Sequence, residues 1–597
     1  MNIGDITDRL TQADVHKFAA SPIWGHSTDG LDHVQWPDCL LSTLCIHRAW
    51  PRLPEVAALT LITIIREFGA MPFKEEQLLV VIPPGSIGVN YRVGLLKLLE
   101  AGIVFAVRKA WGEKLYFIPQ DSFVNWYRII FLDDILPPIE ELNVSHIMFS
   151  PDEEEVYKPM LGLQLIHTLA EMQRTGMKLT SKGYLTKRTV EKASKHIHLR
   201  AAEMDRLHLS RLSRDGKYTG YPIPFAFFLE LFFIHGWITQ SQESVEIRLA
   251  CWENWLSLPS LSRESKLLHT LIQHFAFQNT QTAHTAVVMC QLLPMKWYRI
   301  ADILLSLHKI LGDSNSAITD DNLIKDWCNL LSAFGWLEMA RLISGEPIVR
   351  WLINPQLLED SSILPLIEGE SIRITPDGEI FVYPDSSGQI RWLLENIALR
   401  KLTDRVTVYK LDSALLLRMD KLGLSCESII NRLEEASGEE LPHTVRIAIA
   451  SLKTTEFCQE EEGPIQLSVQ LASEGKSMTN MSPFPEPPSL YAYDLLLEWP
   501  SYKSLFVGLD EVPTMWIKQL RSYHHSTKRE LLERALSWRT AVKLNYRGSV
   551  QSFVPERIEG DGVDWAVVGQ FYEENGTEQL RLKPTMWQEM MLVIPIE

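Results

Sequence analysis

The stretch from Ser371 to about Lys453 constrains the fold most, because its hydrophobic period changes several times within a short length. Ile372 and Ile374 alternate with Arg373, which predicts a half-buried strand. Pro376, Asp377 and Gly378 supply turn chemistry, and the chain returns as a second strand over 379–383. The stretch therefore opens with a predicted β-hairpin.

Helical and strand patterns then follow one another along the same stretch. Apolar residues at helical spacing predict a helix that ends near Ile397, and the alternation over 405–409 predicts a third strand. Three short helices are then expected, and their apolar residues are Leu415, Leu416 and Met419, then 429–436, then Val445, Ile449 and Leu452. This order describes a small α/β module.

The same stretch carries a resemblance to a known family. Its motifs, in order, are P-D-G-E-I-F-V-Y-P-D, D-R-V-T-V-Y-K-L-D-S-A-L-L, G-L-S-C-E-S-I-I-N-R-L and L-P-H-T-V. The pattern resembles the helicase-associated domain at the N-terminus of XPB-type helicases, and most of all the bacterial stand-alone relatives that lack a motor. The resemblance covers about a seventh of the chain. It implies that the protein engages DNA, or a helicase or other DNA-processing protein, as an accessory subunit.

Length and composition set the class of protein. A chain of 597 residues with 46% apolar and 22% charged residues has material for several globular domains. No apolar run is long enough for a membrane span, and the N-terminus lacks the pattern of a signal peptide, so we expect no membrane partner and a cytoplasmic location. Seven dispersed cysteines with no C-x-x-C pair favour reduced thiols and argue against a zinc site.

The net charge of −17 weighs against a generally basic nucleic-acid binder, so a local basic cluster is required for DNA binding. Residues 178–217 contain eleven basic and four acidic side chains, a local charge of +7. The motif L-T-S-K-G-Y-L-T-K-R within this stretch also resembles a helix-turn-helix-like segment of the helicase-associated family. The candidate phosphate-binding residues are Lys178, Lys182, Lys187, Arg188 and Lys192. The alternative is an ordinary exposed helical face rich in lysine.

Upstream of this cluster, residues 51–150 have the element order of a winged helix. Helices are expected at 55–68, 74–81 and 90–101, followed by strands at 103–107 and 114–118. The third helix of such a unit can enter the major groove. Here that helix offers only Arg92 and Lys97, so a protein-binding or purely structural unit is at least as well supported.

The expected fold class is α+β and multi-domain, with mainly helical winged-helix-like units, a small central α/β module and a C-terminal SH3-like β-barrel. The expected divisions are a helical lead-in (1–50), a winged-helix-like unit (51–150), a basic helix-turn-helix-like unit (151–260), a further winged helix (261–360), the helicase-associated module (361–456), a linker (457–510) and the barrel (511–597).

The C-terminal region resembles the ligand-sensing WYL domain in L-N-Y-R-G, F-V-P-E-R-I, W-A-V-V-G and R-L-K-P. It departs from that family where a Trp-Tyr-Leu triplet is expected, since Trp565-Ala-Val stands there. The resemblance therefore does not predict that this region senses a ligand.

No residue pattern supports catalysis. Gly475-Lys-Ser lacks the glycine five residues earlier that a phosphate loop requires, because Gln470 stands there. His524, His525 and Ser526 are adjacent and do not face one another as a nucleophile and its base, and His196 and His198 are expected to be surface histidines. We expect no enzymatic activity, no cofactor and no metal.

The function expected from the sequence is a non-enzymatic DNA-binding or helicase-associated accessory protein in DNA repair, recombination or transcription. Two alternatives remain open. One is a protein-interaction scaffold without direct DNA contact, which the net charge favours. The other is a ligand-responsive transcription regulator.

Overall fold

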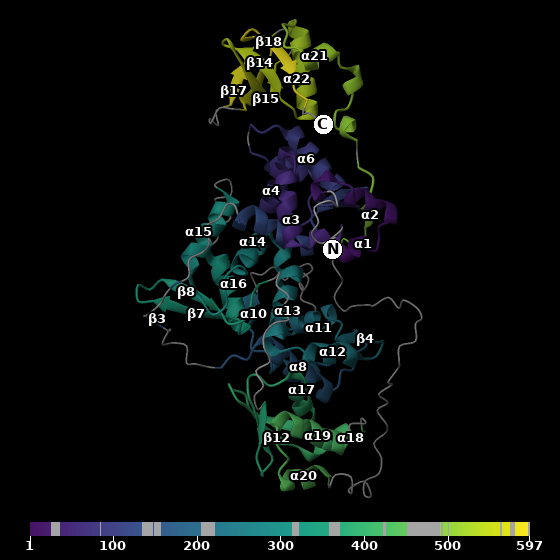
Figure 1. The fold of residues 1–597 in the computed structure, drawn as a ribbon, viewed down its shortest axis with the longest axis vertical. Coiled ribbons are helices and arrows are strands. Elements are labelled where there is room, and N and C mark those ends of the chain that lie inside the picture. The colour runs from purple at the N-terminus through teal and green to yellow at the C-terminus, as the bar shows by residue number, and fades with distance from the viewer. Residues whose placement is uncertain are drawn as a thin grey trace.

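The chain folds into a mixed α+β, multi-domain molecule with several small sheets (Figure 1). The computed structural model describes residues 1–25, 36–83, 85–110, 112–133, 142, 147–148, 157–204, 221–312, 321–356, 371–421, 425–450, 490, 493–499, 501–560, 564–572 and 579–594. The Gly475 loop and most of the expected linker lie outside these ranges. No described helix is both long and apolar enough to cross a bilayer.

The first unit has the elements that its sequence predicts. The three expected helices are α4 (Glu55–Phe68), α5 (Glu75–Val81) and α6 (Gly88–Glu100). The expected hairpin is β1 (Phe105–Arg108) paired antiparallel with β2 (Lys114–Phe117). Helices α1 (Ile3–Thr7), α2 (Gln12–Ala19) and α3 (Thr43–Ala49) precede the unit, and α7 (Gln120–Tyr127) follows it.

A similar order occurs three times: a helix, an extended segment, two further helices and a hairpin, with the additional short helix α10 (Ala201–Met204) in the second unit. The second unit contains α8 (Leu161–Thr175), α9 (Lys187–Ser194), α11 (Ile223–Ile234), β4 (Ile238–Gln240) and β5 (Val245–Ile247). The third contains α14 (Thr280–Met289), β6 (Trp297–Arg299), α15 (Ile300–Leu311), α16 (Asp321–Ala333), β7 (Leu337–Leu342) and β8 (Pro347–Trp351). In each unit the segment between the first two helices pairs with the hairpin, at Phe73 with Tyr116, Lys178 with Ser244, and Trp297 with Arg350.

A glycine with positive φ ends the third helix of every unit. These residues are Gly102, Gly236 and Gly335, with φ of 65°, 63° and 74°. The next amide donates to a carbonyl five residues back in each case, for example Trp237 to Phe232 at 2.9 Å and Trp336 to Leu331 at 3.0 Å. This is the Schellman arrangement, in which glycine avoids the strain of the left-handed conformation. The same type of turn therefore precedes the hairpin in all three units.

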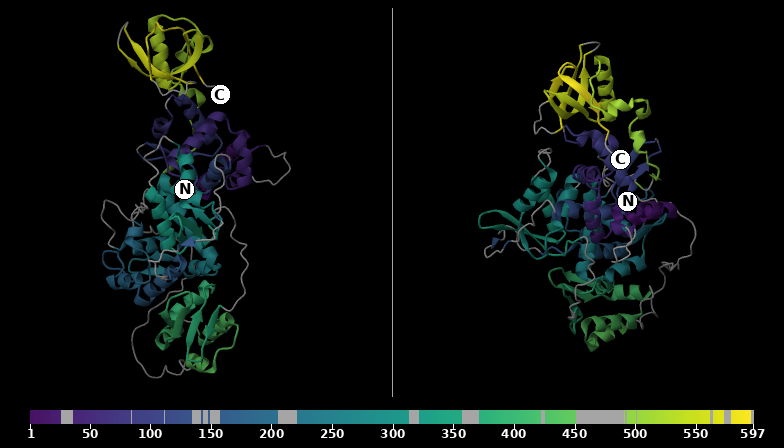
Figure 2. Two further views of the ribbon diagram at one scale, coloured as in Figure 1. Left: turned by 90° about the vertical axis from the view of Figure 1, so that its left-hand side faces the viewer. Right: turned by 45° about the horizontal axis from the view of Figure 1, so that its top comes forward.

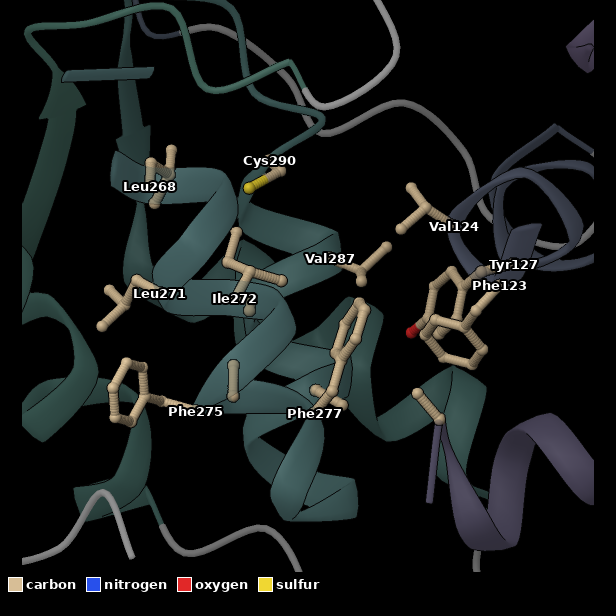
Figure 3. Packing of buried hydrophobic residues seen from close by; sticks show 14 of the residues in the cluster. Phe123, Val124, Tyr127, Leu268, Leu271, Ile272, Phe275, Phe277, Val287 and Cys290 are labelled. Carbon is tan, nitrogen blue, oxygen red and sulfur yellow. The ribbon is translucent and has the colours of Figure 1, made fainter. Parts of the chain in front are cut away.

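One large apolar cluster joins the three units into a single body. Helices α12 (Leu249–Leu256) and α13 (Ser260–His274) connect the second unit to the third. Phe123 of α7 meets Phe277 edge-on with ring centroids 5.2 Å apart, and the Tyr127 hydroxyl lies 2.9 Å from Nδ1 of His284 (Figure 3). The strand β13 (Asp494–Leu496), far along the chain, adds to β1 of the first unit.

The central module forms the lower part of Figure 1 and has its own apolar core. Its expected hairpin is β9 (Ile372–Ile374) with β10 (Glu379–Val382), and the helix near Ile397 is α17 (Gly388–Ile397). The other elements are β11 (Ala398–Leu402), β12 (Thr407–Leu411), α18 (Ser413–Lys421), α19 (Cys426–Ser437) and α20 (His443–Ala450). The strand order is β11-β12-β10-β9, and β11 is a strand that the sequence did not predict.

The C-terminal domain packs a helix against a five-stranded sheet. The helix α22 (His525–Trp538) follows the short α21 (Thr514–Lys518), and the strands are β14 (Val542–Tyr546), β15 (Ser549–Glu559), β16 (Ala566–Phe571), β17 (Leu580–Leu582) and β18 (Trp587–Leu592). Their order is β17-β16-β15-β14-β18, and the pairings among the described residues do not close the sheet into a ring. The sequence T-K-R-E over 527–530 fits a capping box and predicts a helix over 531–538. That start is wrong, because the His524 side chain accepts from the amide of Ser526 and caps a helix that begins at His525.

Candidate nucleic-acid interface

Two of the five candidate lysines and arginines lie on a bonded turn after α8. The amide of Leu179 donates to the carbonyl of Glu243 at 2.8 Å, and the amide of Val245 donates to Met177 at 2.9 Å. The segment that carries Lys178 is therefore held as a strand beside the β4–β5 hairpin. The amide of Thr180 donates to Tyr184 at 2.7 Å, and Gly183 has a φ of 78°. This tight turn leaves Lys182 exposed at its tip.

The other three candidates lie on α9. Thr186 caps this helix by accepting from the amide of Thr189, whose own hydroxyl donates to the carbonyl of Gly176 at 2.7 Å. Because α9 buries Thr189, Val190 and Ala193, helical periodicity places Lys187 and Arg188 on the exposed side and Lys192 at its margin.

The position of Lys187 and Arg188 is unfavourable for the helix alone. They occupy its first turn, where the macrodipole disfavours cations by about 0.3–1 kcal/mol each. Within the described residues, Lys178, Lys182 and Arg188 form no ion pair, and Lys187 meets Glu191 at 3.6 Å with both side chains exposed. Such a surface pair contributes little. The positive charge of this face therefore stays largely unneutralised.

A hollow of about 560 Å³ lies beside the same face. Its lining includes Arg188, Lys192 and Lys195, which recur at intervals of four and three residues, together with Pro222 at the start of α11. The basic residues Arg206, Arg211, Arg214 and Lys217, which contribute to the charge counted from the sequence, lie outside the described residues. The positive surface is thus defined here by α9 and the preceding turn, and we call it the α9 face.

A carboxylate anchors the margin of the α9 face. Lys192 Nζ lies 4.0 Å from Glu171 on α8, and Arg174 Nη1 donates to the same carboxylate at 2.9 Å. Burial alone would raise the pKa of Glu171, but hydrogen bonds from His196 and Thr175 and the charge of Arg174 lower that pKa to about 2. Glu171 is therefore ionised at any physiological pH and holds Lys192 against the body.

Arg400 on β11 joins the central module to the second unit. Its Nη1 donates to Nδ1 of His167, and its Nη2 donates to Nδ1 of His196 at 2.9 Å. Burial, and then the charge of Arg400, lowers the pKa of His167 well below its usual range. A neutral His167 carries its proton on Nε2, which lies 3.5 Å from Glu395.

The sequence did not indicate this junction. Glu395 also accepts from the Tyr409 hydroxyl at 2.8 Å, and the backbone carbonyl of Glu395 accepts from Arg174 at 2.6 Å. The side chain of His196, expected at the surface, is only 24% exposed and packs against Arg400. The contact between His196 and Arg400 spans 204 residues and therefore has no signature within a sequence window.

The third helices of the first two units do not offer a free groove-reading surface. In the first unit, Val89, Val93 and Leu96 of α6 belong to the apolar cluster of the C-terminal domain. Arg92 donates to Glu75 at 2.6 Å, and Lys97 pairs with Glu100 at 3.3 Å. In the second unit, residues 225–232 of α11 are all buried. Major-groove entry by α6, which the winged-helix order allowed, does not fit this packing.

Neither a protein-family model nor a curated protein sequence matches the chain.

Proposed function

We propose that the protein is a non-enzymatic, cytoplasmic DNA-binding accessory protein that holds phosphates on the α9 face. The observation that carries this proposal is the exposed and largely unpaired basic set of Lys178, Lys182, Lys187 and Arg188, concentrated on one turn and one helix of a chain with a net charge of −17. A cationic surface of this kind binds the backbone and carries no base specificity.

We also propose fold assignments for the parts of the chain that are consistent with DNA binding. The three repeats are proposed as winged-helix units, residues 371–450 as an XPB-type helicase-associated module and residues 511–594 as a WYL-like, SH3-like barrel. In this reading the second unit contacts DNA through its turn and second helix, because its third helix is part of the core. The module is fixed to that unit through Arg400, which supports a joint role in engaging DNA or a helicase partner.

The test reverses two charges on the α9 face. In the Lys187→Glu, Arg188→Glu variant, we expect duplex DNA binding to weaken roughly tenfold or more. Loss of two phosphate contacts should also reduce the slope of log affinity against log salt by about 2. Fluorescence anisotropy of a labelled duplex at several salt concentrations measures both quantities.

A matched control makes the same change of net charge elsewhere. Lys309 and Lys325 are exposed on α15 and α16 of the third unit, so the Lys309→Glu, Lys325→Glu variant should retain the salt slope of the unmodified protein. Equal effects of the two variants would show that only total charge matters and would remove the α9 face from the proposal.

The second candidate is a protein-interaction scaffold. It is favoured by the net charge and by the covering of α6 by the C-terminal domain. Absence of binding to both single-stranded and duplex DNA at low salt would favour the scaffold, because phosphate contacts are strongest there.

A further inference from the structure

The sheet of the central module has one apolar face in a core and one face of mixed character. Ile372, Ile380, Val382 and Tyr409 are buried among the module's helices. Side chains alternate along a strand, so Arg373, Phe381 and Val408 lie on the opposite face, and none of the three belongs to that core. Figure 1 places α18 and α19 to the right of β12, and the left-hand view of Figure 2 looks onto the strands from the other side.

Strand pairing aligns this second face into rows. Arg373 lies opposite Phe381, Phe381 opposite Val408, and Val408 opposite Leu402, so one row crosses all four strands. At about 4.8 Å between strands, the row spans about 14 Å. The next row places Glu379 opposite Lys410 and Lys410 opposite Leu399. We call this surface the outer sheet face.

The outer sheet face combines exposed apolar groups with positive charge. Leu399 is 40% exposed and Leu402 is 54% exposed, both on the edge strand β11, and Phe381 is half-buried. In these rows Arg373 and Lys410 are exposed and Glu379 is the one acid, and Lys401 is exposed beside them at the register shift between Arg400 and Leu402. These basic side chains outnumber the acidic ones, on a chain with a net charge of −17. The face therefore complements an anionic ligand that also has an apolar surface.

The edge strand β11 of the outer sheet face also contacts the second unit. Arg400 belongs to β11, and its guanidinium contacts His196 just beyond the end of α9. Its neighbours Leu399, Lys401 and Leu402 are all exposed. Alternation turns the Arg400 side chain away from the outer sheet face, so the two surfaces share the strand β11 and not this side chain.

We propose that the outer sheet face binds single-stranded nucleic acid, with a base stacked on Phe381 and phosphates held by Arg373, Lys401 and Lys410. An aromatic ring flanked by basic side chains suits single strands, because every unpaired base offers a face for stacking. Bases inside a duplex are already stacked and do not reach a ring on an open sheet. This inference rests on the proposed nucleic-acid function and extends it to a second surface and a defined strand state.

The test uses the full chain and two labelled probes. One is an oligo(dT) of about 12 nucleotides, within the usual site sizes of single-strand binders, and the other is a duplex of the same length. Phe381→Ala should weaken oligo(dT) binding by about 5- to 150-fold, the range for losing one stacked base, and should leave duplex binding unchanged. Phe381→Trp retains a ring and should retain the affinity.

Two further variants separate stacking from folding and charge. Tyr572→Ala removes a 51% exposed aromatic ring from the C-terminal domain and should bind oligo(dT) as the unmodified protein does. Arg373→Ala with Lys410→Ala leaves the core of the module intact, and it should reduce the salt slope for oligo(dT) by about 1.4. Matching circular dichroism melts would show that each variant is folded.

Three outcomes overturn the inference. The first is that oligo(dT) does not bind, or binds equally to Phe381→Ala. The second is that sedimentation shows self-association that Phe381→Ala abolishes, which assigns the face to a second copy of the chain. The third is that a protein partner competes for the face and oligo(dT) does not. If oligo(dT) binding depends on Phe381 while the α9 reversal changes nothing, the α9 proposal fails and this one stands.

Discussion

Substitution of Glu264 by glutamine should make the protein more stable at pH 8 and change little at pH 5. Glu264 of α13 is 2% exposed and joins the second and third units. It accepts from the amide of Gly162 at 3.0 Å and from Nε1 of Trp336 at 2.7 Å. Burial raises the pKa of this carboxyl from 4.5 to about 7, although the two donors and Arg263 act in the opposite direction.

The sign and size of the effect follow from that pKa. The folded protein keeps the carboxyl proton up to about pH 7, whereas the unfolded chain releases it near pH 4.5. The stabilising contribution is therefore complete below about pH 4.5 and is lost as pH rises to about 7. One pKa unit is about 1.4 kcal/mol, so the loss is about 3 kcal/mol. Glutamine does not ionise and retains one acceptor oxygen for both donors.

The assay is the difference in free energy of unfolding between Glu264→Gln and the unmodified protein at pH 5 and pH 8. Taking a difference cancels the other titrating groups. Glu246→Gln removes an exposed carboxylate of β5 and serves as the control for the change from Glu to Gln. An equal effect of Glu264→Gln at both pH values would show that burial does not hold the proton on this carboxyl.

Three further substitutions test other contacts. Gly94→Ala places a methyl group against Thr60 and the carbonyl of Val56, and should lower the free energy of unfolding by about 2–3 kcal/mol in a urea titration. Arg400→Ala removes one of the two guanidinium groups beside the buried Glu395 carboxylate and leaves Arg174, so we expect a loss of about 1–3 kcal/mol and faster limited proteolysis of the central module. Lys528→Met keeps the apolar part of the side chain but removes its two 2.8 Å hydrogen bonds to backbone carbonyls. Calorimetry should show that the free energy of unfolding of the C-terminal domain falls by about 1–3 kcal/mol.

Local patterns predicted most of the helices and hairpins. The stripe over 55–68 and the turn at Pro376-Asp377-Gly378 have direct counterparts in α4 and in the β9–β10 hairpin. β11 escaped prediction because it follows α17 without an intervening turn residue. The start of α22 was misplaced because its cap is a histidine side chain, that of His524, and not one of the usual Ser, Thr, Asp or Asn caps.

The candidate site was predictable only in its local parts. The exposure of Lys178, Lys182, Lys187 and Arg188 follows from charge and helical period. The pairing of Lys192 with Glu171 spans two helices, and the contact of Arg400 with His167 spans 233 residues, so neither has a signature within any sequence window. The sequence indicates the outer sheet face only weakly. Phe381 alternates with Ile380 and Val382, so its side chain must face away from their core.

The pairing of β13 with β1 has a consequence for how the chain is made. Val107 lies opposite Leu495, so the first sheet stays incomplete until a strand 388 residues further along the chain has been synthesised. At about 5–20 residues per second, the delay is about 20–80 seconds. During that interval the β1 edge presents unpaired amides and carbonyls to any neighbouring nascent chain. The β1 edge is therefore open to mispairing until β13 has been synthesised.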